Sequence, residues 1–181
     1  RPDYLEIGKI RDEVDAPVIA LTATATPEVA DDIMEKLRFK DKNLIKSGFE
    51  RPNLSYIVRR AEDKTGQLLS ICSGVPGTGI VYVRSRMKTE EVASMLCSKC
   101  ISASFYHAGL PHMTRTARQE EWKSGKVRVM VCTNAFGMGI DKPDVRFVIH
   151  YDVPDSPEAY FQEAGRGGRD GKRSFAVMLW N

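Results

Sequence analysis

The sequence has 181 residues, of which 42% are apolar and 28% charged, with a formal net charge of +3. These values are typical of a globular protein and exclude a disordered, fibrous or strongly acidic chain. The mild basic excess permits a polyanionic partner without requiring one, and no apolar run is long enough to predict a membrane span.

The first part of the chain, residues 1–47, contains few predicted elements. Residues 18–21 form a short apolar run that predicts a buried strand. Thr26 and Pro27 predict the start of a helix that extends to about Leu37, because Thr is a good N-cap and Pro is tolerated at the first helical position. These elements are too few for a sheet, so we expect residues 1–47 to be the end of a preceding α/β domain.

The rest of the chain alternates between apolar strands and amphipathic helices. Residues 48–60 are expected to form a connector and a first strand, and residues 61–181 the remainder of a second domain. Strands are predicted at 54–58, 79–83, 104–106, 127–132, 145–150 and 175–179, and helices around 67–71, 88–96, 114–122 and 156–165. This alternation predicts an α/β fold with a parallel sheet that carries helices on both faces.

Four cysteines are present, and among them only Cys97 and Cys100 have the two-residue spacing of a metal or redox pair. A structural zinc site needs four ligands, and the sequence offers no second pair at a suitable distance. We therefore expect free cysteines, no metal site and a reducing, intracellular location, in the cytoplasm and nucleoid or in the nucleus.

The strongest chemical signal is the segment 162–171, Gln-Glu-Ala-Gly-Arg-Gly-Gly-Arg-Asp-Gly. It places Arg166 and Arg169 in a glycine-rich turn after a predicted helix. A guanidinium stays charged at neutral pH, and glycines let the backbone approach a ligand closely. The segment therefore suits stabilisation of a transferring phosphoryl group, and the alternative is an ordinary glycine-rich surface turn.

A second signal is the strand that leads into a loop at residues 131–142, which contains Thr133, Gly139 and Asp141. Open α/β sheets bind ligands at the ends of their strands. Backbone N–H groups and the Thr133 hydroxyl are suited to a phosphate, and Asp141 is suited to a ribose hydroxyl. The alternative is a tight connection between two strands.

Two further strand ends carry polar residues. His107 follows one predicted strand and is suited either to a structural hydrogen bond or to a nucleic-acid phosphate. Thr22 and Thr24 follow the run at 18–21, where they would cap the next helix or contact a neighbouring domain. The sequence contains no G-x-x-x-x-G-K-[ST] phosphate loop, so a complete nucleotide site needs residues from outside it.

Taken in order, these segments resemble the later motifs of superfamily 2 helicases, and the residues within them resemble those of the RecQ family. The resemblance covers nearly the whole chain. Residues 21–25 resemble motif III, 80–86 motif IV, 133–142 motif V and 162–171 motif VI. The stretches 49–54, 136–146 and 160–163 have the RecQ form.

The resemblance implies a motor of two RecA-like domains that uses ATP with Mg²⁺ to move 3′ to 5′ on single-stranded DNA and to unwind duplex junctions. Residues 1–47 would end the first RecA-like domain and residues 61–181 would belong to the second. The ATP would be shared with an upstream domain, which would bind most of the nucleotide and the metal. Because the Walker A and B motifs are absent from this sequence, we expect the chain alone to be inactive.

The resemblance also implies a role for each candidate residue. Arg169 would be the arginine finger with Arg166 beside it, and Gln162, Asp141 and Gly139 would contact the nucleotide. The DNA strand would be contacted by five residues, namely Ser85, Arg86, His107, Thr133 and Asn134. Thr22 and Thr24 would couple hydrolysis to domain movement. One alternative is a nucleic-acid-binding scaffold that has lost its motor. The other is a related RNA helicase, and the residues of motifs V and VI argue against this second alternative.

Overall fold

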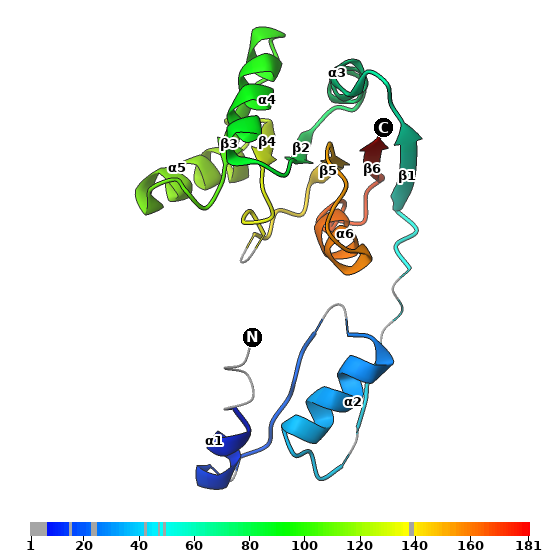
Figure 1. Ribbon diagram of the computed structural model, residues 1–181, viewed down its shortest axis with the longest axis vertical. Coiled ribbons are helices and arrows are strands. Elements are labelled where there is room, and N and C mark those ends of the chain that lie inside the picture. The colour runs from blue at the N-terminus through cyan, green and yellow to red at the C-terminus, as the bar shows by residue number, and fades with distance from the viewer. Residues whose placement is uncertain are drawn as a thin grey trace. The chain divides into compact units, whose positions relative to one another are not determined.

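The computed structural model describes residues 7–14, 16–22, 25–41, 43–46, 48, 50–137 and 140–181. The chain divides into two compact units, Arg1–Glu50 and Arg51–Asn181. Figure 1 traces both units and labels their helices and strands.

The described residues of the first unit form two helices, α1 (Ile7–Glu13) and α2 (Pro27–Lys36). Thr26 caps α2, because its side chain accepts a hydrogen bond from the Val29 N–H at 3.4 Å, and the predicted helix start is confirmed. The strand predicted at 18–21 is wrong, since these residues are irregular and Ile19 and Leu21 are 82% and 91% exposed. A strand needs a neighbour for its backbone hydrogen bonds, and the described residues of this unit include no other strand.

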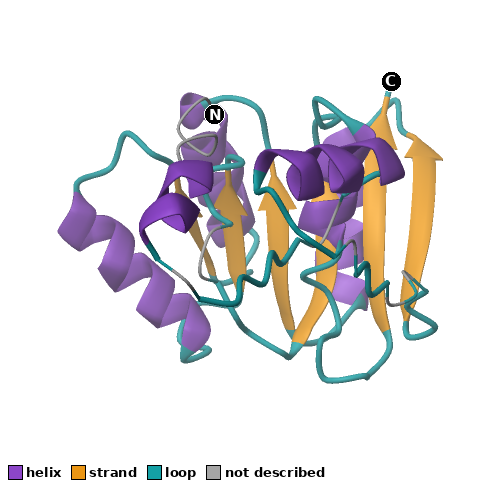
Figure 2. Cartoon of the chain, turned by 90° about the horizontal axis from the view of Figure 1, so that it is seen from below, coloured by secondary structure: helices purple, strands orange, loops and turns teal. Residues whose placement is uncertain are grey.

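In the part of the second unit that the structure describes, a six-stranded sheet is combined with four helices. Its strands are β1 (Leu54–Arg60), β2 (Thr78–Tyr82), β3 (Ala103–Tyr106), β4 (Val129–Cys132), β5 (Val145–His150) and β6 (Ser174–Trp180). Its helices are α3 (Lys64–Gly74), α4 (Arg86–Ser98), α5 (His112–Lys123) and α6 (Pro157–Ala164). The strand order is β1-β6-β5-β2-β4-β3 and every pair is parallel, as the common direction of the arrows in Figure 2 shows. The predicted parallel α/β sheet is confirmed.

The two faces of the sheet are covered by different helices. Successive residues of a strand point to opposite faces. Val81 and its equivalents on the neighbouring strands pack with α3 and α4, whereas Ile80 and its equivalents pack with Trp122 of α5. Ala164 of α6 packs on Ala176, which lies on the same face as α5. Helices therefore cover both faces, as the alternation of elements predicts.

The connection from β4 to β5 is residues 133–144, and its described residues, 133–137 and 140–144, form a loop instead of a helix. Phe136 and Ile140 anchor this loop in the core beside Trp122. The Trp122 indole N–H donates to the Gly79 carbonyl at 3.1 Å, so this buried polar group is satisfied. The loop is thus packed along the face of the sheet that α5 and α6 cover.

Candidate functional site

Five of the predicted site residues gather where neighbouring strands end. Because the sheet is parallel, the carboxyl ends of β2, β4 and β3 meet at one edge. The Thr133 N–H donates to the Tyr106 carbonyl at 3.2 Å, which joins the ends of β4 and β3. We call this group the strand-end cluster, and it consists of Ser85, Arg86, His107, Thr133 and Asn134.

Within the strand-end cluster, Ser85 is the N-cap of α4, since its hydroxyl accepts from the Lys88 N–H at 3.1 Å. Arg86 and His107 meet at Gly109, where an added Cβ would lie 2.8 Å from Arg86 Nη1 and 3.2 Å from His107 Nδ1. His107 is buried, with its Nε2 3.4 Å from Glu90 Oε1. Its Nδ1 has no hydrogen-bond partner among the described residues. This buried ring nitrogen and the Arg86 guanidinium thus both lie close to Gly109.

A small pocket lies beside the strand-end cluster, between the ends of β2 and β5 and the start of α6. Its lining includes Arg84, Asn134 and His150. The Arg84 N–H donates to Asp152 Oδ2 at 3.0 Å, and His150 Nε2 lies 2.9 Å from Glu163 Oε2. At about 100 Å³ the pocket is smaller than typical ligand pockets of roughly 300–1,000 Å³. It therefore cannot enclose a whole nucleotide.

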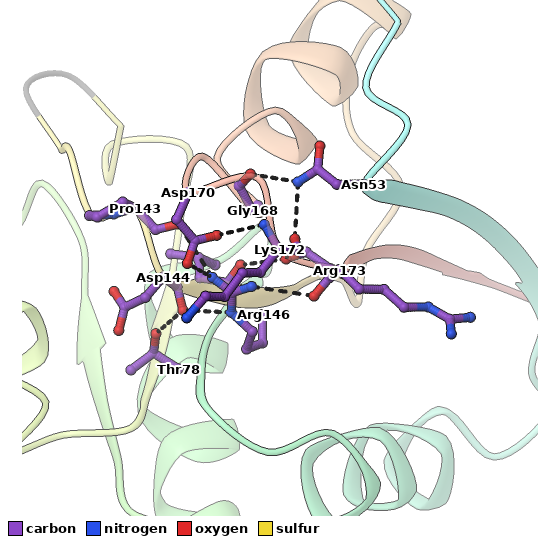
Figure 3. Close-up of polar contacts among 12 residues, drawn as sticks. Asn53, Thr78, Pro143, Asp144, Arg146, Gly168, Asp170, Lys172 and Arg173 are labelled. Carbon is purple, nitrogen blue, oxygen red and sulfur yellow. Dashed lines mark hydrogen bonds and ion pairs between the residues drawn. The ribbon is translucent and has the colours of Figure 1, made fainter.

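The glycine-rich segment after α6 is a turn that two connector residues hold in place. Arg51 donates from Nη2 to the carbonyls of Gly167 at 2.8 Å and Gly168 at 2.9 Å, and from Nη1 to that of Gly165 at 3.4 Å. Asn53 Nδ2 donates to the Gly168 carbonyl at 2.6 Å (Figure 3). Neither residue is among the predicted site residues. Both lie just before β1, and the pairing of Leu54 with Ser174 brings that position close to the end of the turn.

The same turn is held from β5 by Arg146. Its Nη2 lies 2.6 Å from Asp170 Oδ2 and its Nη1 donates to the Arg173 carbonyl at 3.3 Å, as the dashed lines in Figure 3 show. The Asp170 N–H donates to the Pro143 carbonyl at 3.1 Å. The hydrogen bond from Arg146 lowers the pKa of the Asp170 carboxyl. The turn is therefore fixed on two sides.

The two predicted arginines of this turn have different surroundings. The Arg169 side chain is 38% exposed, and its Nη1 donates to Asp141 Oδ1 at 3.0 Å. Arg166 is 8% exposed, and its Nη2 lies against Gly137, where an added Cβ would be 2.7 Å away. Burial raises the pKa of Tyr82 far above its usual value, and the neighbouring charge of Arg166 opposes that rise. Arg169 is therefore the more accessible guanidinium.

The turn does not lie at the strand-end cluster. The Gly168 N–H donates to the carbonyl of Val145, the first residue of β5, so the turn lies where β5 begins. The loop 133–144 runs between these two places, from Thr133 at the end of β4 to Asp141 beside Arg169. The structure thus divides the predicted site residues into two groups.

Four predicted residues remain, and two of them lie in the described parts of the chain. Gln162 is exposed on α6, and Thr22 is exposed in the first unit. Thr24 and Gly139 lie outside the described residues. Over the parts of the chain that the structure describes, no three or more potential ligands gather as a metal site. None of the helices described here has the length and apolarity needed to cross a membrane.

Comparison with known proteins identifies the family. The helicase conserved C-terminal domain matches residues 63–171. The chain belongs to this family. It is 44% identical over its whole length to the RecQ-like DNA helicase blm-1 of Caenorhabditis elegans, and 41% identical over 99% of its length to the probable ATP-dependent DNA helicase RecS of Bacillus subtilis. The RecQ resemblance is confirmed, and this helicase C-terminal chain spans 19% and 37% of the two relatives.

Solved structures agree on the fold. The helicase C-terminal chain matches a DEAD box protein from Methanococcus jannaschii with a TM-score of 0.67 and 28% identity, covering 87% of this chain and 43% of that one. It matches S. cerevisiae Dbp5 bound to RNA and ADP BeF3 with a TM-score of 0.78 and 21% identity, covering 96% of this chain and 48% of that one. The predicted RecA-like fold is confirmed.

Proposed function

We propose that this chain is part of an ATP-dependent DNA helicase of RecQ type. In the full-length protein, ATP hydrolysis would drive 3′ to 5′ movement on single-stranded DNA and the unwinding of duplex junctions. Residues 1–47 would end the first RecA-like domain, 48–60 would connect the domains, and 61–181 would belong to the second. The whole-length similarity to RecQ-like DNA helicases supports this proposal, and its DNA substrate implies an intracellular location.

The observation that carries the proposal is the exposed Arg169 on a turn held at both sides. A transferring phosphoryl group develops charge that a preorganised guanidinium stabilises. The Asp141 side chain that pairs with Arg169 is 81% exposed, so exchanging this carboxylate for a phosphate costs little. Arg169 would act as the arginine finger. Arg166, which is buried at Gly137, would support the loop beside it.

The other nucleotide contacts would come from residues near this turn and from a second domain. Gln162 and Asp141 are exposed and would meet the nucleotide, together with Gly139. The Mg²⁺ ligands and the phosphate loop would be supplied by the first RecA-like domain.

The strand-end cluster would hold the phosphates of single-stranded DNA. The amino end of α4, capped by Ser85, favours an anion, and Arg86 adds a fixed positive charge. His107, whose Nδ1 lies with Arg86 Nη1 close to Gly109, would support this site. Thr133 and Asn134 lie on the next strand end. Thr22 and Thr24 would couple hydrolysis to domain movement.

The test is steady-state ATPase of the full-length protein with single-stranded DNA or RNA. Arg169→Ala should lower the DNA-stimulated kcat by about 10³-fold or more, the usual worth of an arginine finger. Arg173→Ala is the matched control, because it removes the same charge from an exposed residue nearby whose side chain lies over Phe175. Weak stimulation by RNA would support DNA as substrate. A chain that binds DNA but shows no stimulated hydrolysis would instead be a scaffold without a motor.

A further inference from the structure

Arg51 and Asn53, at the start of the second unit, contact the turn that carries Arg169. We propose that Arg51 and Asn53 are positioning residues for Arg169, and that they make its placement depend on the conformation of the connector. This inference rests on the proposed role of Arg169 as the arginine finger. Neither residue would touch ATP itself.

The Arg51 guanidinium is matched to the carbonyls it contacts. Gly165 is the C-cap of α6, and carbonyls at the carboxyl end of a helix lack partners inside the helix and carry partial negative charge. Arg51 satisfies the carbonyl of Gly165 and those of Gly167 and Gly168 from two nitrogens of one planar group. A lysine has one nitrogen and lacks this forked geometry, so it cannot reproduce all three contacts.

The best-held point of the turn is the peptide bond that leads into Arg169. The Gly168 carbonyl belongs to that bond, and it accepts hydrogen bonds from Arg51 at 2.9 Å, from Asn53 at 2.6 Å and from the Gly171 N–H at 3.1 Å. Three donors on one carbonyl fix the orientation of the peptide plane. The backbone of Arg169 is therefore oriented by the connector.

Asn53 also closes the turn from outside. Its Nδ2 donates to the Lys172 carbonyl at 3.0 Å, and the backbone carbonyl of Asn53 accepts from the Ser174 N–H at 2.8 Å. Figure 3 shows Asn53 bridging Gly168 and Lys172, on either side of Arg169. Hydrogen bonds from Asn53 thus join the connector to both ends of the turn.

The contacts of Arg51 and Asn53 with the turn lie within the second unit, at its start. Arg51 is the first residue after the boundary between the two compact units. A change of backbone conformation there would move the donors that hold the Gly168 carbonyl. Misplacing a catalytic group by about 1 Å can cost about 100-fold in rate, so a small connector movement would be enough to switch Arg169 between effective and ineffective positions.

The experiment compares variants of the full-length protein by DNA-stimulated ATPase and thermal unfolding. Arg51→Ala should lower kcat by about 10- to 100-fold with little change in KM for ATP, because the finger is misplaced and ground-state binding is kept. Arg51→Lys should restore part of this loss. Asn53→Ala should also lower kcat, and it replaces Arg51→Ala as the test variant if Arg51→Ala does not fold.

Arg128→Ala is the matched control. Arg128 also donates to three carbonyls, those of Gly77, Val75 and Cys72 at 2.8, 2.6 and 2.6 Å, but these lie at the end of α3 and just beyond it. Its loss should lower the midpoint of thermal unfolding and leave kcat nearly unchanged at temperatures where the protein is folded. A purely structural role for Arg51 would give the same result as this control and would overturn the proposal.

A double variant distinguishes the positioning role of Arg51 from the proposed arginine-finger role of Arg169. Since Arg51 acts through Arg169, Arg51→Ala combined with Arg169→Ala should be no slower than Arg169→Ala alone. Additive losses would overturn the positioning role while leaving the finger in place. Full activity of Arg169→Ala would show that the finger assignment itself is wrong and would overturn both.

Discussion

The Arg169 guanidinium donates to the Asp141 carboxylate at 3.0 Å, which joins the glycine-rich turn to the loop after β4. Both side chains reach solvent, at 38% and 81% exposure. Water screens such a pair and side-chain entropy opposes it, so its contribution to stability is small. The pair is therefore suited to exchange with a ligand, and the fold does not depend on it.

Asp141→Asn should lower the free energy of unfolding of the chain by less than about 1 kcal/mol, the usual range for exposed ion pairs. Urea unfolding measures this directly. Asp155→Asn is a suitable control, because Asp155 pairs with Arg84 at 3.8 Å and both of these side chains are mostly exposed. A loss of several kcal/mol for Asp141→Asn alone would mean that the pair supports the fold.

Gly168→Ala should be more destabilising than Gly171→Ala. Both glycines have positive φ, +59° and +77°, so each alanine incurs a backbone cost of roughly 1–2 kcal/mol. At Gly168 the new Cβ would also lie 2.6 Å from Asn53 Nδ2 and 2.7 Å from Ser174 Oγ, whereas at Gly171 the space is open. Urea midpoints of the two variants give the difference. Equal midpoints would contradict the tight contact between the turn and the connector.

The ion pair of Arg146 and Asp170 should make stability depend on acid pH. The folded-state pKa of Asp170 is lowered, so its contribution is present above the ordinary value of 3.8 and is lost as the pH falls below it. The stability difference between the chain and its Asp170→Asn variant should therefore be constant near neutral pH and shrink below about pH 4. Urea unfolding at several pH values tests this. A difference that stays constant down to pH 3 would contradict the ion pair.

The four cysteines should divide into two reactive and two protected thiols. Cys97 and Cys100 are exposed, whereas Cys72 and Cys132 are buried. Burial raises the pKa of Cys72 to about 11 and that of Cys132 far above its usual value, so neither forms the reactive thiolate at pH 8. A disulfide reagent should titrate two thiols in the native chain and four in denaturant. Cys97→Ser combined with Cys100→Ser should remove the fast reaction.

Much of the fold was predictable because the relevant signals are local. Short apolar runs predict the strands of the second unit, and Thr26 and Ser156 each cap the helix that follows, as their short-range hydrogen bonds show. The run at 18–21 has the same local signal and is not a strand. Its failure shows that an apolar run predicts a strand only where a neighbouring strand is present to pair with it.

The candidate site was predictable as a set of residues but not as an arrangement. The glycines and arginines of 162–171 are visible in the sequence, yet their surroundings are not, and burial of Arg166 at Gly137 is apparent only after folding. The elements of the second unit, their order and the residue types available for phosphate chemistry could be predicted from the sequence, since these depend on neighbours a few positions apart. The accessibility of Arg169 and the contact from Arg51 to the Gly168 carbonyl follow from folding alone, because they depend on residues 28 and 117 positions apart in the chain.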